Sequence, residues 1–217
     1  MKIAILCAMP EEAKLIIEEF SMKKNETDKH FDVYESEDLI LLISKIGKIY
    51  ATMGAKRLIQ TYDIDMIINI GLAGSLKKEY EVGTVLLGEK IVQHDVFLPW
   101  EGEHLDYLKG EIYIVNKVEM LRKLGIDIDT VTILTGDQFI HNKEKIHELA
   151  KIGDIVDMEA FAIASVCKVF TRDLIVIKAI SDNALLEENS KKEFEINIDK
   201  AMKNSIKLLK EVIVALR

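Results

Sequence analysis

Acidic side chains stand where a predicted strand ends, and they could carry out acid–base chemistry. The clearest is Asp182, in the stretch KAISDN, directly after an apolar run at residues 174–179. Ligands bind outside the carboxyl ends of parallel strands, so Asp182 is either a helix cap or an active-site acid. Lys178 places a second charge inside the same apolar run. Two such charges in an apolar setting favour a site.

The stretches AMPEEA and VDMEAFAIA contribute two further acids. Glu12 opens a predicted helix after Pro10, where an acid favours the helix dipole or, alternatively, acts as a general base. Glu159 stands in an apolar segment that we predict to be a buried helix over residues 158–170. A buried carboxylate needs partners, and a sugar diol that donates two hydrogen bonds would provide them.

Two uncharged stretches also follow predicted strands. GLAGSL is either a tight turn or backbone that lies against a ligand. TGDQFI contains Phe139, which is either a core or surface aromatic or a stacking platform for a flat ring. The five histidines have no metal-ligand spacing, so we expect no metal.

These stretches lie in a chain where predicted strands alternate with predicted helices. Apolar runs predict strands, and apolar residues at helical spacing predict amphipathic helices. The strands are expected at residues 3–8, 39–43, 66–70, 82–87, 90–94, 131–134 and 174–179. This alternation is typical of α/β proteins with a mostly parallel sheet. We see no linker or repeat, and we expect one domain over residues 1–217.

Composition narrows the classes of function. The chain is 49% hydrophobic and 30% charged, which is ordinary for a globular protein. A net charge of −8 argues against a nucleic-acid partner, which needs a basic face. No run approaches the roughly 18 apolar residues of a membrane span, and the apolar start ends too early for a signal peptide. We expect a cytoplasmic protein that binds a small neutral or cationic molecule, with no nucleic-acid or membrane partner.

Seven motifs in this order resemble those of the 5′-methylthioadenosine/S-adenosylhomocysteine nucleosidases, in the nucleoside phosphorylase/hydrolase superfamily. The motifs are AMPEEA, SKIGK, GLAGSL, QHDV, TGDQFI, VDMEAFAIA and AISDN. They span nearly the whole chain. The resemblance implies a single three-layer αβα domain with a central mixed, mostly parallel sheet, a small-molecule nucleoside substrate, no cofactor and a homodimer.

The resemblance also implies a reaction, the cleavage of the N-glycosidic bond of a 5′-substituted adenosine by water. Asp182 would be the general acid that protonates N7 of the purine, which requires an upward-tuned pKa. Ser181 and Asn183 would hold this acid, and Glu12 would activate the water. The transition state would resemble an oxocarbenium ion, so negative charge near C1′ would stabilise it.

The remaining residues implied by the resemblance would bind the nucleoside. Glu159 would accept hydrogen bonds from the ribose 2′- and 3′-hydroxyls, and Met158 would pack beneath the ribose. Phe139 would stack on adenine, and the backbone of Ile140 would bond the base edge.

The glycine-rich stretch and one lysine complete this site. Ala73 and Gly74 would line the pocket beside the base and the water. Lys178 stands where the family usually has arginine. Lysine keeps the charge and loses the fork geometry, which bears on how Glu12 is oriented.

Two more departures from the family pattern concern loops. Leu185 replaces an acid of the family, and Phe97 stands where the family usually has aspartate. In relatives, the region around residues 97–107 helps to form the pocket for the 5′ group, partly across a dimer interface. A changed loop there could change the substrate.

Several other functions remain open at this point. The substrate could be another purine nucleoside, such as aminofutalosine, adenosine or inosine. A phosphorylase would carry arginine in or after the glycine-rich turn, and this chain has Lys77-Lys78-Glu79 instead, which favours hydrolysis. A non-catalytic nucleoside-binding module would have lost Asp182, Glu12 or Glu159, and all three are present.

Overall fold

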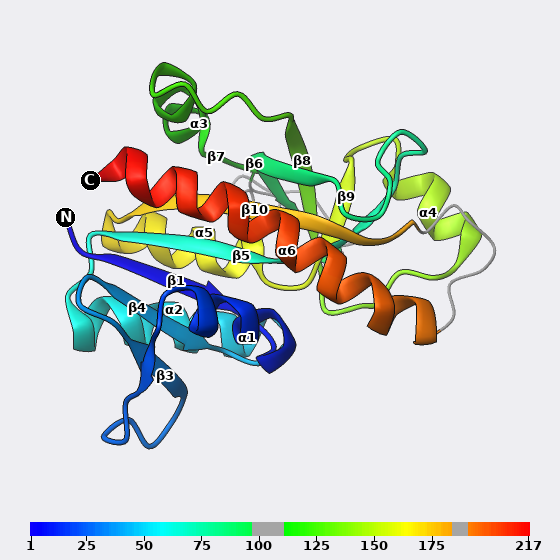
Figure 1. Cartoon of the computed structure of the whole chain (residues 1–217). Coiled ribbons are helices and arrows are strands. Elements are labelled where there is room, and N and C mark those ends of the chain that lie inside the picture. The colour runs from blue at the N-terminus through cyan, green and yellow to red at the C-terminus, as the bar shows by residue number, and fades with distance from the viewer. Residues whose placement is uncertain (97–110, 184–190) are drawn as a thin grey trace.

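The computed structural model describes residues 1–96, 111–183 and 191–217 (Figure 1). Its elements, in chain order, are β1 (Ile3–Cys7), α1 (Pro10–Glu19), β2 (Lys23–Lys24), β3 (Asp32–Glu35), β4 (Leu39–Ile43), α2 (Lys48–Tyr62), β5 (Met66–Ser75), β6 (Val85–Gln93), β7 (Glu111–Tyr113), α3 (Val115–Lys123), β8 (Thr130–Thr135), α4 (Lys143–Leu149), β9 (Ile155–Asp157), α5 (Ala160–Phe170), β10 (Asp173–Asn183) and α6 (Lys191–Leu216). The predicted alternation of strands and helices is confirmed.

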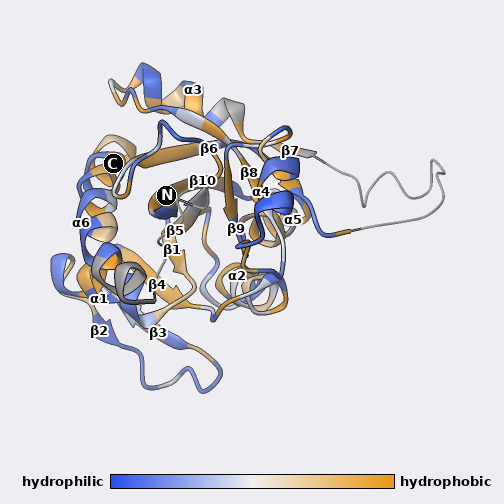
Figure 2. Cartoon of the chain, turned by 90° about the vertical axis from the view of Figure 1, so that its right-hand side faces the viewer, coloured by the Kyte–Doolittle hydropathy of each residue, from blue (hydrophilic) through white to orange (hydrophobic). Residues whose placement is uncertain are grey.

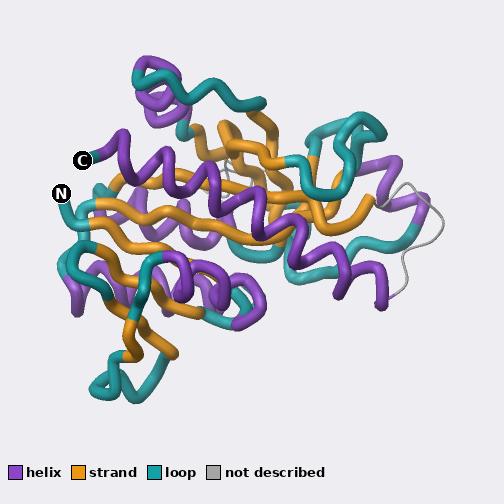
Figure 3. Tube along the Cα trace, viewed as in Figure 1, coloured by secondary structure: helices purple, strands orange, loops and turns teal. Residues whose placement is uncertain are grey.

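Both faces of the sheet are covered by helices, as the first strand illustrates. Ile3 and Ile5 of β1 belong to a core cluster that includes residues of α1, α3 and α6. Ala4 and Leu6, which alternate with them, belong to a second cluster with α2 and α5. Because side chains of a strand point alternately to opposite faces, β1 is apolar throughout. Figures 1 and 3 show the resulting three layers.

The sheet is mixed, and part of it closes into a ring. β4, β1, β5 and β10 lie side by side in parallel, whereas β10 pairs with β6 in antiparallel orientation. β6 continues through β8 to β9, and β9 returns to the end of β5 through Gly74 and Ser75. The ring brings the carboxyl ends of β5, β8, β9 and β10 together.

Several strands differ from the prediction: β2, β3 and β7 were not predicted, and β10 continues past residue 179, so that Asp182 lies inside the strand and not after it. The run GLAGS is not a turn, because β5 continues through it to Ser75 and pairs with β10 along its length. The apolar runs at residues 82–87 and 90–94 belong to one strand, β6, with an irregularity between Gly88 and Lys90. Glycine signals a turn in many sequences, but here it serves close packing, as the site shows.

The hydrophobic residues concentrate in the strands and on the inner sides of the helices (Figure 2). α6, the longest helix, alternates between apolar residues in the core and charged residues outside. Among the helices in the described ranges, none has the length and apolar character needed to cross a membrane.

Candidate active site

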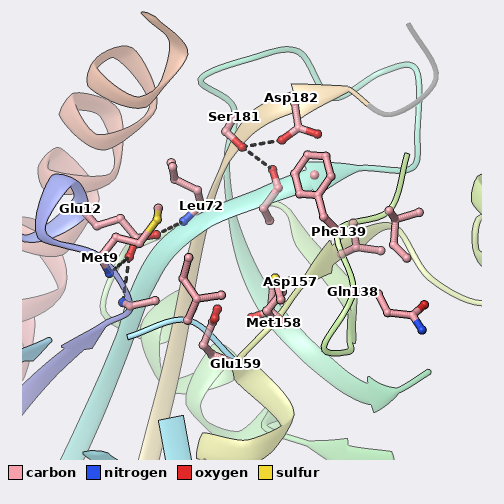
Figure 4. Close-up of a pocket in the computed structure, with 16 residues that line it drawn as sticks. Met9, Glu12, Leu72, Gln138, Phe139, Asp157, Met158, Glu159, Ser181 and Asp182 are labelled. Atoms are coloured by element: carbon pink, nitrogen blue, oxygen red, sulfur yellow. Dashed lines mark hydrogen bonds between the residues drawn. The ribbon is translucent and has the colours of Figure 1, made fainter. Parts of the chain in front are cut away.

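A pocket opens at the carboxyl ends of the ring strands and holds roughly 660 Å³ of empty space, part of it open to solvent. This size suits a small organic ligand. Nine of the residues predicted for the site line it: Glu12, Ala73, Gly74, Phe139, Ile140, Met158, Glu159, Ser181 and Asp182. Figure 4 shows Asp182 and Phe139 toward one end of the pocket and Glu12 toward the other.

Two predicted residues are not among those that line the pocket. Lys178 is buried beneath it, with 1% of its surface exposed. The structure therefore does not place Lys178 at the pocket surface, and its assignment to substrate binding stays a prediction. Asn183 is the last residue of β10, and its side chain lies outside what the structure describes.

Seven lining residues were not predicted. They are Ala8, Met9, Ile46, Leu72, Gln138, Val156 and Asp157. All seven lie inside the sequence motifs, and four of them, Leu72, Gln138, Val156 and Asp157, stand next to a predicted residue or one position away. The motifs therefore contained the signal, although we predicted roles for only some of the positions in them.

Glu12 is fixed by three backbone N–H groups. Its Oε2 accepts hydrogen bonds from Ala8 (2.9 Å) and Met9 (3.0 Å), and its Oε1 accepts one from Leu72 (2.9 Å). A carboxylate offers about four acceptor positions, so Oε1 keeps one for a further donor. Burial raises the pKa of Glu12, against the lowering effects of Lys178 and the three N–H groups. Glu12 is thus a rigid carboxylate with heightened basicity and one open acceptor position.

The glycine-rich part of β5 makes room for this carboxylate. A Cβ on Gly71 would lie 2.7 Å from Oε1 of Glu12, well inside contact distance. A Cβ on Gly74 would lie 3.2 Å from Oδ2 of Asp182. The glycines of GLAGS therefore let two acids approach a strand backbone closely, which explains why they occur inside a strand.

Asp182 stands in an apolar setting next to a hydroxyl. The Ser181 hydroxyl donates to Oδ1 of Asp182 at 2.7 Å. Burial raises the pKa of the Asp182 carboxyl, and the Ser181 hydrogen bond lowers it by a smaller amount. A raised pKa keeps a larger fraction of the carboxyl protonated near neutral pH, as a general acid requires.

Glu159 is the N-cap residue of α5 and does not stand within that helix, which begins at Ala160. The prediction that Glu159 lies inside the helix is wrong, because the helix begins at the next residue. Its Oε1 accepts a hydrogen bond from the Gly47 N–H at 2.9 Å. Burial raises the pKa of Glu159 to about 7, assisted by the negative charge of Asp157. No hydrogen bond to another described residue occupies its Oε2, so that oxygen is open to a ligand.

A buried ion pair lies under the pocket. Lys178 Nζ is 2.8 Å from Oδ2 of Asp157, and the same oxygen accepts from the Ala160 N–H at 2.9 Å. The Thr135 hydroxyl donates to Oδ1 of Asp157 at 2.5 Å. Burial acts to lower the pKa of Lys178, but Asp157, Glu159 and Glu12 outweigh it and raise that pKa. Lys178 is therefore a permanent cation among three acids.

Glu12 is held in a fixed orientation although Lys178 stands where the family usually has arginine. No ion pair joins Lys178 to Glu12 within the described ranges, and the backbone hydrogen bonds of Glu12 fix its position. Lys178 reaches Glu12 only through its charge, which lowers the pKa of that acid.

A network of polar contacts among three residues holds the loop that carries Gln138, Phe139 and Ile140. The three residues are Lys48, Asp95 and Asp137. Asp137, which precedes them, accepts from the Lys48 N–H at 2.8 Å, and its own N–H donates to Asp95 at 2.8 Å. Lys48 Nζ bonds Asp95 at 2.6 Å. Because the neighbouring Gly47 N–H holds Glu159, the start of α2 ties two parts of the pocket wall together.

The pocket therefore offers acid–base chemistry on a flat, partly apolar ligand. Four of its lining residues are carboxylic acids, and none of the described lining residues is lysine or arginine. Phe139 leaves 61% of its surface exposed, and so presents an aromatic surface for stacking. No three His, Cys, Asp or Glu side chains in the described ranges are grouped to hold a metal ion.

Comparison with known proteins gives matches over nearly the whole chain. The family model of the phosphorylase superfamily matches residues 2–214. The chain is 30% identical to the aminodeoxyfutalosine nucleosidase of Helicobacter pylori, over 98% of this chain and 97% of that protein. It is 32% identical to the 5′-methylthioadenosine/S-adenosylhomocysteine nucleosidase of Hydrogenovibrio crunogenus over the full length of both. The Neisseria meningitidis nucleosidase of the latter kind, solved with methylthio-immucillin-A, superimposes with a TM-score of 0.85 at 28% identity over 98% of each chain.

Proposed function

Because the chain belongs to the phosphorylase superfamily, in the nucleosidase branch that its sequence motifs resemble, we propose that it hydrolyses the N-glycosidic bond of 5′-substituted adenosines. The products are adenine and the free ribose derivative. The observation that supports hydrolysis best is the composition of the pocket lining. Four of the described lining residues are acids, and none is lysine or arginine. Without a lysine or arginine among these lining residues to bind phosphate, the pocket favours water as the nucleophile.

The acid end of the pocket makes the base a better leaving group. With adenine stacked on Phe139, the protonated Asp182 carboxyl donates its proton to N7, and the C1′–N9 bond breaks with both electrons going to the base. The hydrogen bond from Ser181 (2.7 Å) stabilises the carboxylate that is left behind. General acid catalysis of this kind contributes roughly 10²–10⁴-fold to rate.

The base end of the pocket supplies the nucleophile. A water bound at the open position of Glu12 Oε1 attacks C1′ as its proton passes to Glu12. Glu159 accepts hydrogen bonds from the ribose hydroxyls, and Met158 packs under the sugar. The acids lie close to the positive charge that develops at C1′, which lowers the barrier. Asp182 regains a proton and Glu12 loses one to solvent after the products leave.

A second candidate substrate is aminodeoxyfutalosine, which the name of the Helicobacter pylori relative suggests. It shares the adenosine part and differs in the 5′ group. The residues of this chain that depart from the family at 97–107 lie outside the described ranges, as does Leu185. The choice between the two substrates therefore has to be made by measurement.

The chain is also proposed to act as a homodimer. Four apolar residues at the start of α2 and just before it are 44–71% exposed: Ile46, Ile49, Tyr50 and Met53. Ile46 also lines the pocket, so a second copy packed on this surface would cover the pocket mouth. Sedimentation at several protein concentrations tests this proposal. From the resemblance alone, we further propose a cytoplasmic role in nucleoside catabolism and methionine salvage.

The test of the reaction is release of adenine from 5′-methylthioadenosine, S-adenosylhomocysteine and aminodeoxyfutalosine, with and without phosphate. We expect release in phosphate-free buffer with free 5-methylthioribose from the first substrate. Release only with phosphate would make the protein a phosphorylase and refute the role of Glu12. No release from any of the three would refute the function proposed here, and a fast reaction on one alone would identify the preferred 5′ group.

A further inference from the structure

The end of β10 contains a bulge immediately before the proposed acid. Ile180 lies opposite Ala73 of β5, and Asp182 lies opposite Gly74, so Ser181 is one extra residue on β10. Earlier in the pairing, even-numbered residues of β10 face odd-numbered residues of β5. After the extra residue this relation changes, because the even-numbered Asp182 of β10 faces the even-numbered Gly74 of β5. Bulges commonly re-aim a side chain next to an active site, and this one determines where the Asp182 carboxyl points.

Ser181 has no residue opposite it on β5, and helix α6 supplies a donor for its carbonyl. Ser181 is 1% exposed, and a buried carbonyl needs a hydrogen-bond donor. Asn197 of α6 supplies it, with its Nδ2 at 3.0 Å from the Ser181 oxygen. The hydroxyl of the same serine donates to Asp182. One continuous chain of contacts thus runs from the Asn197 amide through Ser181 to the Asp182 carboxyl.

We propose that Asn197 is a positioning residue for the acid, which holds the Ser181 bulge so that Asp182 faces the pocket. This inference rests on the proposed function. Asn197 does not line the pocket, so it acts through Ser181 and not on the substrate.

The same helix offers a matched control. Asn204 lies seven residues after Asn197, two turns along α6 and on the same face. Its Nδ2 donates to the Gly83 carbonyl at 2.8 Å, so it also fastens α6 to a backbone oxygen of the sheet region. Its bond reaches the segment before β6 and neither Ser181 nor Asp182. Loss of either bond removes one attachment of α6 to the sheet region, but only the Asn197 bond reaches the residue that donates to the acid.

The test measures the titration of Asp182 directly, in protein labelled with ¹³C at the aspartate carboxyls. Asp182→Asn identifies the Asp182 signal. If Asn197→Ala loosens the bulge, the Ser181–Asp182 bond weakens, and the pKa of Asp182 rises further, because that bond lowers it. Asn204→Ala should leave the pKa at the wild-type value. Asn197→Leu, which has a similar side-chain size but neither a hydrogen-bond donor nor a charge, replaces the alanine variant if that variant does not fold.

Turnover gives the second measurement. We expect kcat to fall about tenfold or more in Asn197→Ala, since small misplacements of catalytic groups are costly, with KM close to wild type and little change in Asn204→Ala. Equal Asp182 titrations in the two variants would overturn the positioning role. The titration needs no substrate, so it still decides this inference if wild-type protein releases no adenine, a result that would count against the proposed function alone.

Discussion

Lys178 and Asp157 form an ion pair, 2.8 Å between Nζ and Oδ2, directly beneath a pocket whose wall includes two further acids of this cluster, Glu12 and Glu159. Both partners have side chains that are 2% exposed or less. Lys178 therefore places a positive charge close to acids that line the pocket, without lining the pocket itself.

Removal of this cation should destabilise the protein strongly. In Lys178→Met, Asp157 remains as a buried acid without its ion-pair partner, and we expect a loss of about 3–5 kcal/mol of unfolding free energy. Denaturant titration measures it. Lys178→Met combined with Asp157→Asn should recover a large part of the loss. Equal stability of the single and double variants would show that the ion pair matters less than the packing of the lysine.

Replacement of the acid should abolish base release and leave the fold intact. Asp182→Asn keeps the side-chain shape but cannot donate a carboxyl proton to N7. We expect kcat to fall about 10²–10⁴-fold, with an unchanged circular dichroism spectrum. Ser181→Ala is a milder change, because it removes only the hydrogen bond that lowers the pKa of Asp182. It should therefore move the alkaline limb of the pH profile of kcat to higher pH. Near-wild-type turnover in Asp182→Asn would eliminate this residue as the acid.

A methyl group on Gly71 should move the proposed base. It would lie 2.7 Å from Oε1 of Glu12, and the tip of a side chain yields more readily than a backbone. We therefore expect Gly71→Ala to fold and to lose roughly tenfold or more in kcat. Gly88→Ala is the control, because its methyl would meet Ile133 Cδ1 at 2.6 Å in the core. It should lower thermal stability without a matching change in kcat.

Glu159 should make stability depend on pH between its unfolded and folded pKa values. The folded pKa is about 7 against an ordinary value of 4.5, so the folded state binds more protons in that window. Stability should therefore fall as pH rises from about 4.5 to 7, by up to about 3 kcal/mol from this group. Denaturant titrations across this range compare wild type with Glu159→Gln. The variant should have a shallower slope, and identical slopes would contradict the assignment.

The polar contacts of Asp137 should affect substrate binding more than the rate of the chemical step. Asp137→Ala removes the acceptor for the Lys48 N–H and loosens the loop that presents Phe139. We expect a several-fold rise in KM, with kcat nearly unchanged, from steady-state kinetics. Asp154→Ala is matched, because Asp154 also accepts one backbone N–H (from Thr132, 2.8 Å) and does not line the pocket. A similar rise in KM for both variants would remove the special role of Asp137.

The sequence indicated the fold class and most of the pocket wall, for reasons that are local. Apolar runs and helical spacing depend on neighbouring residues, and several of the motifs contain an acid or an aromatic residue close to the end of a strand. The extension of β5 through GLAGS could not be predicted in this way. The glycines at 71 and 74 serve contacts with Glu12 and Asp182, which are distant in the chain, and the local signal of glycine is a turn.

Two other features depended on contacts between distant segments. The ring is closed by β9, whose three residues give too short a pattern to predict a pairing with β5. Asn197 looks like an ordinary polar residue of an amphipathic helix, and its partner Ser181 is 16 positions earlier. The roles assigned to Glu12, Glu159 and Asp182 remain predictions.

The position of β10 in the sheet has a consequence for biosynthesis. β10 lies between β5 and β6, and both of these strands leave the ribosome about a hundred residues before it. Until β10 is inserted, β5 and β6 each have one edge that is not yet paired with β10. Glu12 and Glu159 meanwhile lack the positive charge of Lys178. Pairings between distant segments form slowly, and partly folded chains expose strand edges in the meantime. The nascent chain therefore acquires its acid, its buried cation and its completed sheet in the same late step.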